Sequence, residues 1–249
     1  MFATRNLWIG SLSLLLAGGC SQSSSPDPSA TSSSPSAAKT AMTAANSKGG
    51  AKGPAGAKPG AVADDPRSKG IIAGYDVRDD QHPILVLRTN RGDITLRLNA
   101  EKAPRTVYNF MSYASAGHYD QTIFHQVDAN YAMLGGSFTP DLKARPVRYP
   151  IHNEAANGLR NKRGTISMAR SPEVVDSATC EFFINLVDNP QLDHAGNEPK
   201  KFGYCVFGEV IEGMDVVDKI AKVQVTDSGD FAKLPTETVM IQYVRRLVY

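Results

Sequence analysis

The chain has 249 residues, of which 41% are hydrophobic and 21% are charged, and this composition is typical of a globular protein with one or two domains. The net charge of +2 conceals two unlike halves. Residues 1–69 carry seven Lys/Arg and three Asp/Glu, or +4, whereas residues 70–249 carry the remaining 20 and 22, or −2. The part expected to fold therefore lacks the basic patch that indicates nucleic-acid binding.

The N-terminus has the pattern of an export signal. A single positive charge, Arg5, precedes an apolar run that is too short to span a bilayer. We therefore predict a signal peptide over residues 1–19. The small residues in "LAGGC" resemble the lipobox of bacterial lipoproteins, although Ala17 stands where Leu is usual.

The lipobox resemblance implies that Cys20 is acylated and becomes the mature N-terminus. Ser21 follows it instead of Asp, which implies an exported protein anchored by lipid at the periplasmic face of the outer membrane. The alternative is an ordinary secreted protein that is cut near Gly19.

Residues 20–75 are rich in Ser, Pro, Ala, Gly and Lys. Such a segment buries too little apolar surface to offset the entropy of ordering it. We predict a disordered tether with a root-mean-square length of roughly 40 Å, followed by a folded domain over residues 76–249.

The cysteines and histidines indicate no metal site or cofactor. Cys180 and Cys205 form an even pair in an oxidising compartment, so they are either a disulfide or two buried small hydrophobic residues, and we favour the second. No CxxC motif supports a redox pair. The five histidines show no spacing typical of metal ligands; they are His82, His118, His125, His152 and His194.

The first elements of the domain are a hairpin and a helix. Residues 84–89 and 93–98 form apolar and alternating segments, joined by the turn residues Asn90, Arg91 and Gly92. In residues 103–117, proline suits the first helical turn, apolar residues share one face, and a glycine suits the end.

Five short apolar segments follow, separated by Gly, Pro, Asn and Asp: 122–127, 131–138, 164–170, 181–187 and 204–211. A second helix is predicted over 213–223 and a last alternating strand over 237–247. About eight strands and two helices favour a mainly β sandwich or barrel, with helices at its ends.

Three runs in the second half of the chain identify a family. The runs "NEAANGLRNKRGTISMAR", "DSATCEFFINLVDNPQLDH" and "FGYCVFGEVIEGMDVVDKI" resemble cyclophilins, the cyclophilin-type peptidyl-prolyl isomerases, of the bacterial exported kind. The resemblance covers about residues 82–248. It implies an eight-stranded antiparallel barrel capped by two α-helices, with a proline-binding groove on the outer face of the sheet and no cofactor.

The reaction that the resemblance implies needs no nucleophile, acid, base or metal. An Xaa-Pro bond exchanges slowly between its cis and trans forms because of the partial double bond of the amide. A catalyst needs an apolar seat for the proline ring and a donor that favours the twisted amide, and cyclophilins supply that donor from an Arg in "FHR".

Most of the family's groove positions keep a suitable residue in this chain. Phe183 and Leu192 match the proline seat, and Tyr204 matches the bacterial members. Because neighbours in a strand alternate between faces, we expect Phe182 in the core and Phe183 in the groove. The substrate-binding positions that the resemblance implies are Ala132, Leu134, Ala169, Arg170, Glu181, Phe183, Leu192 and Tyr204.

The stretch "FHQVDANYAMLGGSF" departs from the family pattern "FHRVIPGFMIQGG". Gln126 stands at the position of the catalytic Arg, and Tyr131 replaces Phe. Ala132 and Leu134 replace Met and Gln, and Glu181 stands where Gln is usual. We expect His125 to be a packed or hydrogen-bonded side chain and the two glycines to serve the shape of the backbone.

The Gln should weaken catalysis. A charge-assisted hydrogen bond contributes about 1.5–3 kcal/mol and a neutral one about 0.5–1.5, and losing a preorganised donor can cost about 10²–10³ in rate. We predict an isomerase slowed by about one to three orders of magnitude, in which the hydroxyl of Tyr131 can offer a replacement donor.

Two functions follow from the sequence. The first is a membrane-tethered, monomeric peptidyl-prolyl cis-trans isomerase that acts on proline-containing segments of exported proteins during folding. The second is a catalytically inactive module that binds proline-containing peptides.

Overall fold

The computed structural model describes residues 71–76 and 78–248. The predicted signal peptide, Cys20 and the tether up to residue 70 lie outside the described residues. Residues 71–75, which the composition assigned to the tether, belong to a small hairpin of β1 (Ile71–Ile72) and β2 (Tyr75–Asp76). In the part of the chain that the structure describes, no helix has the length and apolar character needed to cross a membrane.

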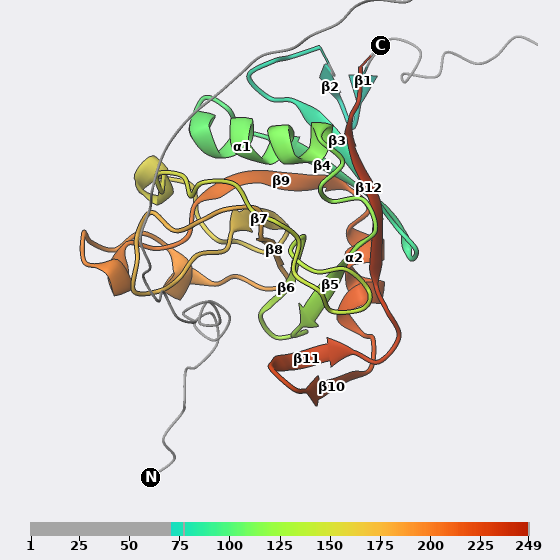
Figure 1. Cartoon of the computed structure of the whole chain (residues 1–249). Coiled ribbons are helices and arrows are strands. Elements are labelled where there is room, and N and C mark those ends of the chain that lie inside the picture. The colour runs from blue at the N-terminus through green and yellow to red at the C-terminus, as the bar shows by residue number, and fades with distance from the viewer. Residues whose placement is uncertain (1–70, 77, 249) are drawn as a thin grey trace, which may run out of the picture. The chain divides into compact units, whose positions relative to one another are not determined.

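Eight antiparallel strands close into a barrel in the order β12-β3-β4-β9-β7-β8-β6-β5 (Figure 1). Pairing of β12 with β5 completes the closure. This confirms the barrel that the sequence predicts. The strands are β3 (Ile84–Thr89), β4 (Gly92–Leu98), β5 (Thr122–Val127), β6 (Ala132–Gly135), β7 (Thr165–Met168), β8 (Phe182–Asn185), β9 (Val206–Glu212) and β12 (Met240–Arg246).

The interior of the barrel is filled by side chains from alternate positions of the strands. In β4, Ile94, Leu96 and Leu98 are each 0% exposed and belong to one large core cluster. Their alternation is the period of two that a strand with one buried face requires.

Helix α1 (Pro104–Ser115) packs its predicted apolar face against the core. Val107, Phe110 and Ala114 are buried in the core cluster. The N-terminus of the helix has Pro104 in its first turn, and the carboxylate of Glu154 accepts the backbone N–H of Thr106 at 2.9 Å. That carboxylate satisfies donors that the helix itself cannot pair.

Helix α2 (Met214–Ala221) also packs against the core, through Val216, Val217 and Ile220. Among the described residues, three short 3-10 helices lie in the loops, at Ala155–Asn157, Pro190–Leu192 and Pro199–Lys201. The sequence predicts both α-helices within a few residues of their observed ends.

A second hairpin, which the sequence analysis missed, follows α2. It consists of β10 (Val225–Ser228) and β11 (Phe231–Pro235). All four residues of β10 are exposed, so the strand has no alternation of buried and exposed residues to reveal it. The turn carries Gly229 at φ +56°, and the glycine within "TDSGDF" was the available signal.

An aromatic cluster occupies the core around Phe182, which is 0% exposed. Its ring meets those of Phe110, Tyr119 and Phe124 at centroid distances of 5.5, 5.5 and 6.0 Å, edge to face in each case. Gly136 has φ +94°, and an added Cβ would lie 2.9 Å from the rings of Tyr119 and Phe182. The glycine pair therefore serves backbone shape, as predicted, and Gly136 ends β6 earlier than the sequence suggests.

We expect Phe182→Ala to lower the free energy of unfolding by about 3–5 kcal/mol, because the change leaves a cavity among aromatic rings that cannot close over it. Denaturant unfolding followed by circular dichroism measures the change. Val174→Ala, at a side chain that is 53% exposed, is the control and should stay within about 0.5 kcal/mol. Equal effects of the two substitutions would contradict this description of the core.

Cys180 and Cys205 are both buried and both free. The Sγ of Cys180 lies 3.5 Å from Ser137 Oγ, and the Sγ of Cys205 lies 3.5 Å from Thr106 Oγ1. Burial raises the pKa of Cys180 to about 11 and that of Cys205 to about 12. The two residues act as small core side chains, which was the favoured interpretation.

These raised pKa values predict low thiol reactivity. At pH 8 only about one Cys180 in a thousand is a thiolate, and fewer still of Cys205, because the fraction falls tenfold for each unit between pH and pKa. We expect both thiols to resist iodoacetamide in the native chain and to react fully in guanidinium. Mass spectrometry of the two peptides reads out the result, and rapid native labelling of either cysteine would show that the thiols are accessible.

Candidate proline-binding groove

A second apolar cluster lies apart from the core. It contains six buried side chains, with Tyr131 partly buried against them: Ala132, Leu134, Ala169, Phe183, Leu192 and Tyr204. All seven were proposed as site residues from the sequence. They come from β6 and the residue before it, from β8, from the residues next to β7 and β9, and from the 3-10 helix Pro190–Leu192, so the barrel brings together residues that are far apart in the chain.

Strand register explains how the cluster forms. Leu134 of β6 pairs with Gln126 of β5 on one side and with Phe183 of β8 on the other. Directly paired residues of neighbouring strands share a face of the sheet. Gln126, Leu134 and Phe183 therefore form a row across three strands.

The pleat of β8 separates groove from core. Phe182 belongs to the core cluster and Phe183 to the second cluster, as predicted. The ring of Phe183 meets that of Tyr204 nearly at right angles, with centroids 5.8 Å apart. Phe183 is 0% exposed, so it forms the floor of the cluster.

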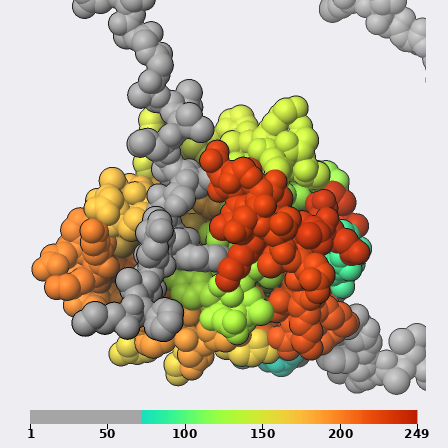
Figure 2. All heavy atoms as spheres, turned by 90° about the horizontal axis from the view of Figure 1, so that it is seen from below, coloured from blue at the N-terminus to red at the C-terminus, as the bar shows by residue number. Residues whose placement is uncertain are grey.

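Figure 2 shows the loops before β9, in orange, and the segments after α2, in red, on opposite sides of the visible face.

Gln126 lies at the edge of this cluster and is half-buried. A bulge in the pairing of β5 with β6, between Phe124 and Gln126, sets its direction. Its side-chain amide makes no hydrogen bond to any residue that the structure describes. The NH₂ group is thus available to a ligand, although it is neutral and shorter than the guanidinium of an arginine.

Glu181 is engaged with a buried histidine. Its carboxylate lies 2.9 Å from His125 Nε2, and the histidine side chain is 4% exposed. The imidazole also packs on Phe138 and Phe231, with ring centroids 4.8 and 6.1 Å away. His125 is therefore a packed, hydrogen-bonded side chain, as expected. The contact holds the carboxylate of Glu181 against the imidazole.

Two tyrosine hydroxyls border the cluster. Burial raises the pKa of Tyr131, and the neighbouring Tyr204 and the carboxylate of Asp128 raise it further. Burial likewise raises the pKa of Tyr204. Both hydroxyls therefore stay protonated through the neutral pH range, and each can donate a hydrogen bond.

Arg170 reaches the cluster only through Tyr204. Its guanidinium carbon lies 4.9 Å from the centre of the Tyr204 ring, and its Nε and Nη2 donate to the carbonyls of Gly203 and Pro199 at 2.8 and 2.6 Å. Gly203 has φ +82°, and an added Cβ would lie 2.6 Å from the backbone N of His194. Arg170 thus packs on the tyrosine, and its contact with a substrate stays a prediction.

A network of buried amides supports the groove, and the sequence analysis missed it. Asn189 Nδ2 donates to the carbonyl of Tyr131 at 3.0 Å and to Asn185 Oδ1 at 2.8 Å. Asn161 donates its N–H to Asp193, beside Leu192, at 2.7 Å. The recurring asparagines near the cyclophilin-like runs were the available signal, because a buried amide must find partners.

The β10–β11 hairpin braces the other side of the groove, beside β5 and β6 (Figure 1). Phe231 packs on Phe138 at a centroid distance of 5.0 Å. Lys233, at φ +52°, forms an ion pair with Asp128 in the turn that leads to Tyr131. Across the described residues there is no group of three or more His, Cys, Asp or Glu side chains that could hold a metal ion.

Comparisons with known proteins agree with this arrangement. A family model described as "Cyclophilin type peptidyl-prolyl cis-trans isomerase/CLD" matches residues 84–246. The chain is 47% identical to peptidyl-prolyl cis-trans isomerase B of Escherichia coli (strain K12) over 161 residues, which cover 65% of this chain and 98% of that protein. It is 48% identical to peptidyl-prolyl cis-trans isomerase A of Dickeya dadantii (strain 3937) over 158 residues, covering 64% and 81%.

A solved structure shares the fold. It is the crystal structure of a cyclophilin type peptidyl-prolyl cis-trans isomerase of Cryptosporidium parvum, with a TM-score of 0.58 and 22% identity, covering 67% of this chain and 99% of that one. At this identity the match concerns the fold alone. Since the family model spans more than half of the chain, over the barrel and its groove, the chain belongs to the cyclophilin-type peptidyl-prolyl cis-trans isomerase family.

Proposed function

We propose that the chain accelerates cis–trans exchange of Xaa-Pro bonds in exported proteins, at a rate below that of a groove with an arginine. The observation that carries the proposal is the row formed by Gln126, Leu134 and Phe183 on one face of the sheet. It sets an apolar seat directly beside an amide donor.

The seat suits a proline ring because its buried members are apolar or aromatic. A proline that enters it loses water from its ring and leaves the amide at the edge of the cluster, near Gln126. Donors there can favour the twisted amide over both planar forms, which is the condition for lowering the barrier. No bond breaks and no proton moves.

The weakened rate follows from the charge that Gln126 lacks. The difference between a charge-assisted and a neutral hydrogen bond is about 1–2 kcal/mol, or roughly five- to thirtyfold in rate. Glu181, whose carboxylate lies 2.9 Å from His125 Nε2, cannot replace the cationic donor at this edge.

A second candidate function is binding without turnover. Ala132 and Leu134 keep the floor apolar, so the seat can hold a proline even if the donor at position 126 is too weak to accelerate exchange. This candidate predicts capture of proline-containing segments with no change in their exchange rate.

The place of action is part of the proposal. The lipobox-like "LAGGC" at Cys20 and the Ser/Pro/Ala/Gly-rich segment after it support an exported protein, anchored by lipid at the periplasmic face of the outer membrane, and we propose that it acts as a monomer. Its clients would be proline-containing segments of other exported proteins.

The first test is the substitution Gln126→Arg. We expect exchange of a short neutral Xaa-Pro peptide to quicken about tenfold or more, because a guanidinium restores a charged, forked donor beside the seat. Exchange NMR measures the rate directly and detects slow turnover.

Gln242→Arg is the matched control, since Gln242 is also half-buried but lies on β12, outside the groove cluster. It should leave the rate unchanged. If neither the native chain nor Gln126→Arg accelerates exchange, while peptide resonances still shift on binding, the chain is a binding module and the enzymatic proposal is wrong.

The hydroxyl of Tyr131 gives a second test. We expect Tyr131→Phe to lower the exchange rate about two- to tenfold, the effect of one neutral hydrogen bond, while peptide affinity changes little because the ring remains. The raised pKa of Tyr131 keeps the hydroxyl protonated, so the native rate should not fall between pH 6 and pH 9. Tyr243→Phe, on β12, is the control, and an unchanged rate in Tyr131→Phe would remove Tyr131 from the mechanism.

A further inference from the structure

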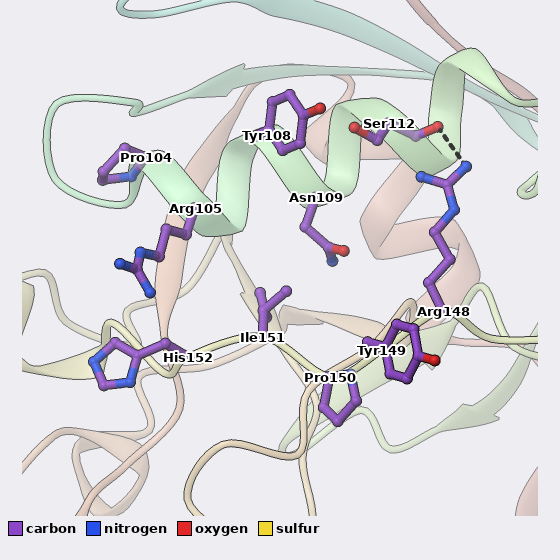
Figure 3. A pocket seen from close by; sticks show the side chains of 10 residues that line it. All are labelled: Pro104, Arg105, Tyr108, Asn109, Ser112, Arg148, Tyr149, Pro150, Ile151 and His152. Carbon is purple, nitrogen blue, oxygen red and sulfur yellow. Dashed lines mark hydrogen bonds between the residues drawn. The ribbon is translucent and has the colours of Figure 1, made fainter.

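An open cleft of about 600 Å³ lies between α1 and residues 148–152, which are not part of the groove cluster. Figure 3 shows Asn109 of the helix and Ile151 of the facing segment pointing toward each other across it, with Arg105 near one end and Arg148 near the other. Its size is that of a site for a short peptide or a small molecule.

Two tyrosines on the rim of the cleft are unusually exposed. Tyr108 is 77% exposed and Tyr149 is 94% exposed. Rings that offer this much surface to water are common in binding sites, because they supply contact area at a low cost in side-chain entropy. A partner that binds in the cleft can therefore bury the apolar surface of these two rings.

The two arginines have no carboxylate partner. Within residues 71–76 and 78–248, neither the guanidinium of Arg105 nor that of Arg148 forms an ion pair. Arg148 Nη2 makes one long hydrogen bond, 3.4 Å, to the carbonyl of Ser112, and its guanidinium lies over the ring of Tyr113 at 4.8 Å. Both keep most of their five donors available.

The neighbouring carboxylates are already satisfied. Glu154 accepts the backbone N–H of Thr106 at 2.9 Å and its hydroxyl at 2.7 Å. Asp176 accepts the N–H of Asn153 at 2.8 Å and lies 3.1 Å from His152 Nδ1, and the pKa of its carboxyl is lowered, mainly by the N–H of Asn153 and in small part by the charge of Arg105. The cleft therefore has positive charge to offer and no unsatisfied negative charge.

The two arginines stand at opposite ends of the cleft (Figure 3). Arg148 Nη2 donates to the carbonyl of Ser112, and Ser112 stands seven positions after Arg105 on α1, or about 10 Å along the helix axis. In a polyproline II segment, residues three apart lie on the same side and are separated by about 9 Å. Glutamate side chains at such positions can extend toward the two guanidinium groups.

The facing backbone also suits such a segment. Residues 146–150, "PVRYP", are all exposed and belong to no strand. The N–H groups of Val147 and Tyr149 make no hydrogen bond within the described part of the chain. Aromatic-lined grooves are a recurrent way of binding polyproline II helices.

We infer that this cleft binds an acidic polyproline II segment of a partner protein, with carboxylates at positions i and i+3 over Arg105 and Arg148. Two isolated cations are too few for a nucleic acid, and the part of the chain after residue 69 carries a net charge of −2. The site is separate from the proline seat, so a single partner can supply both an anchor and a substrate bond.

The test uses the full ¹⁵N-labelled chain and three peptides that contain Glu-Pro-Pro-Glu, Gln-Pro-Pro-Gln or Glu-Glu-Pro-Pro. We expect the first to shift the amide resonances of Asn109, Ser112 and Ile151 and to bind at least tenfold more tightly than the other two. The preference should shrink as salt rises, because screening weakens exposed charge pairs.

Arg105→Gln combined with Arg148→Gln should remove the preference and leave exchange of a neutral Xaa-Pro peptide unchanged. Lys219→Gln, an exposed cation paired with Asp215 on α2, is the matched control and should keep the preference. Because the experiment measures binding at the cleft, its result does not depend on whether the groove catalyses exchange.

Three outcomes would overturn the inference: equal binding of the Glu and Gln peptides, shifts confined to groove residues such as Ala132 and Phe183, or cleft shifts that depend on protein concentration without peptide. The last would mean that a second copy of the chain occupies the cleft.

Discussion

The pleat of β8 places two adjacent aromatic rings on opposite faces of the barrel wall, and both the core and the groove depend on it. Phe182 meets three aromatic rings inside, and Phe183 forms the floor of the outer cluster. A strand slipped by one residue would exchange the two and lose core and seat together. The groove is therefore as rigid as the barrel, because its floor is the outer surface of the same strand.

The chemistry of the groove is less tightly constrained than its shape. Gln126 contributes to the ladder through its backbone, and its half-buried side chain makes no hydrogen bond within the described residues. A change at this position costs the fold little. The apolar seat of Phe183, Leu192 and Leu134 therefore does not depend on which side chain stands at position 126.

The sequence predicts the elements that carry a strong period or a family motif. Alternation in β4 and the apolar face of α1 identify their buried sides, and the quoted runs place Phe183, Leu192 and Tyr204 in one site. Long-range pairings leave no local pattern. The contact of His125 with Glu181 joins residues 56 positions apart, and the exposed β10 has no alternation of buried and exposed residues, so only the folded chain reveals either.

The cleft along α1 bears on the slow turnover that we propose for the groove. A segment held there is covalently joined to the rest of its protein, so nearby prolines reach the groove at the effective concentration of a tethered ligand, which is millimolar for short flexible linkers. Under the proposed function, an isomerase that holds its client would meet the same bond repeatedly before the client leaves. Residence of the client would then matter more than turnover per encounter, and the neutral donor that we propose at position 126 would suffice for clients that carry the acidic anchor.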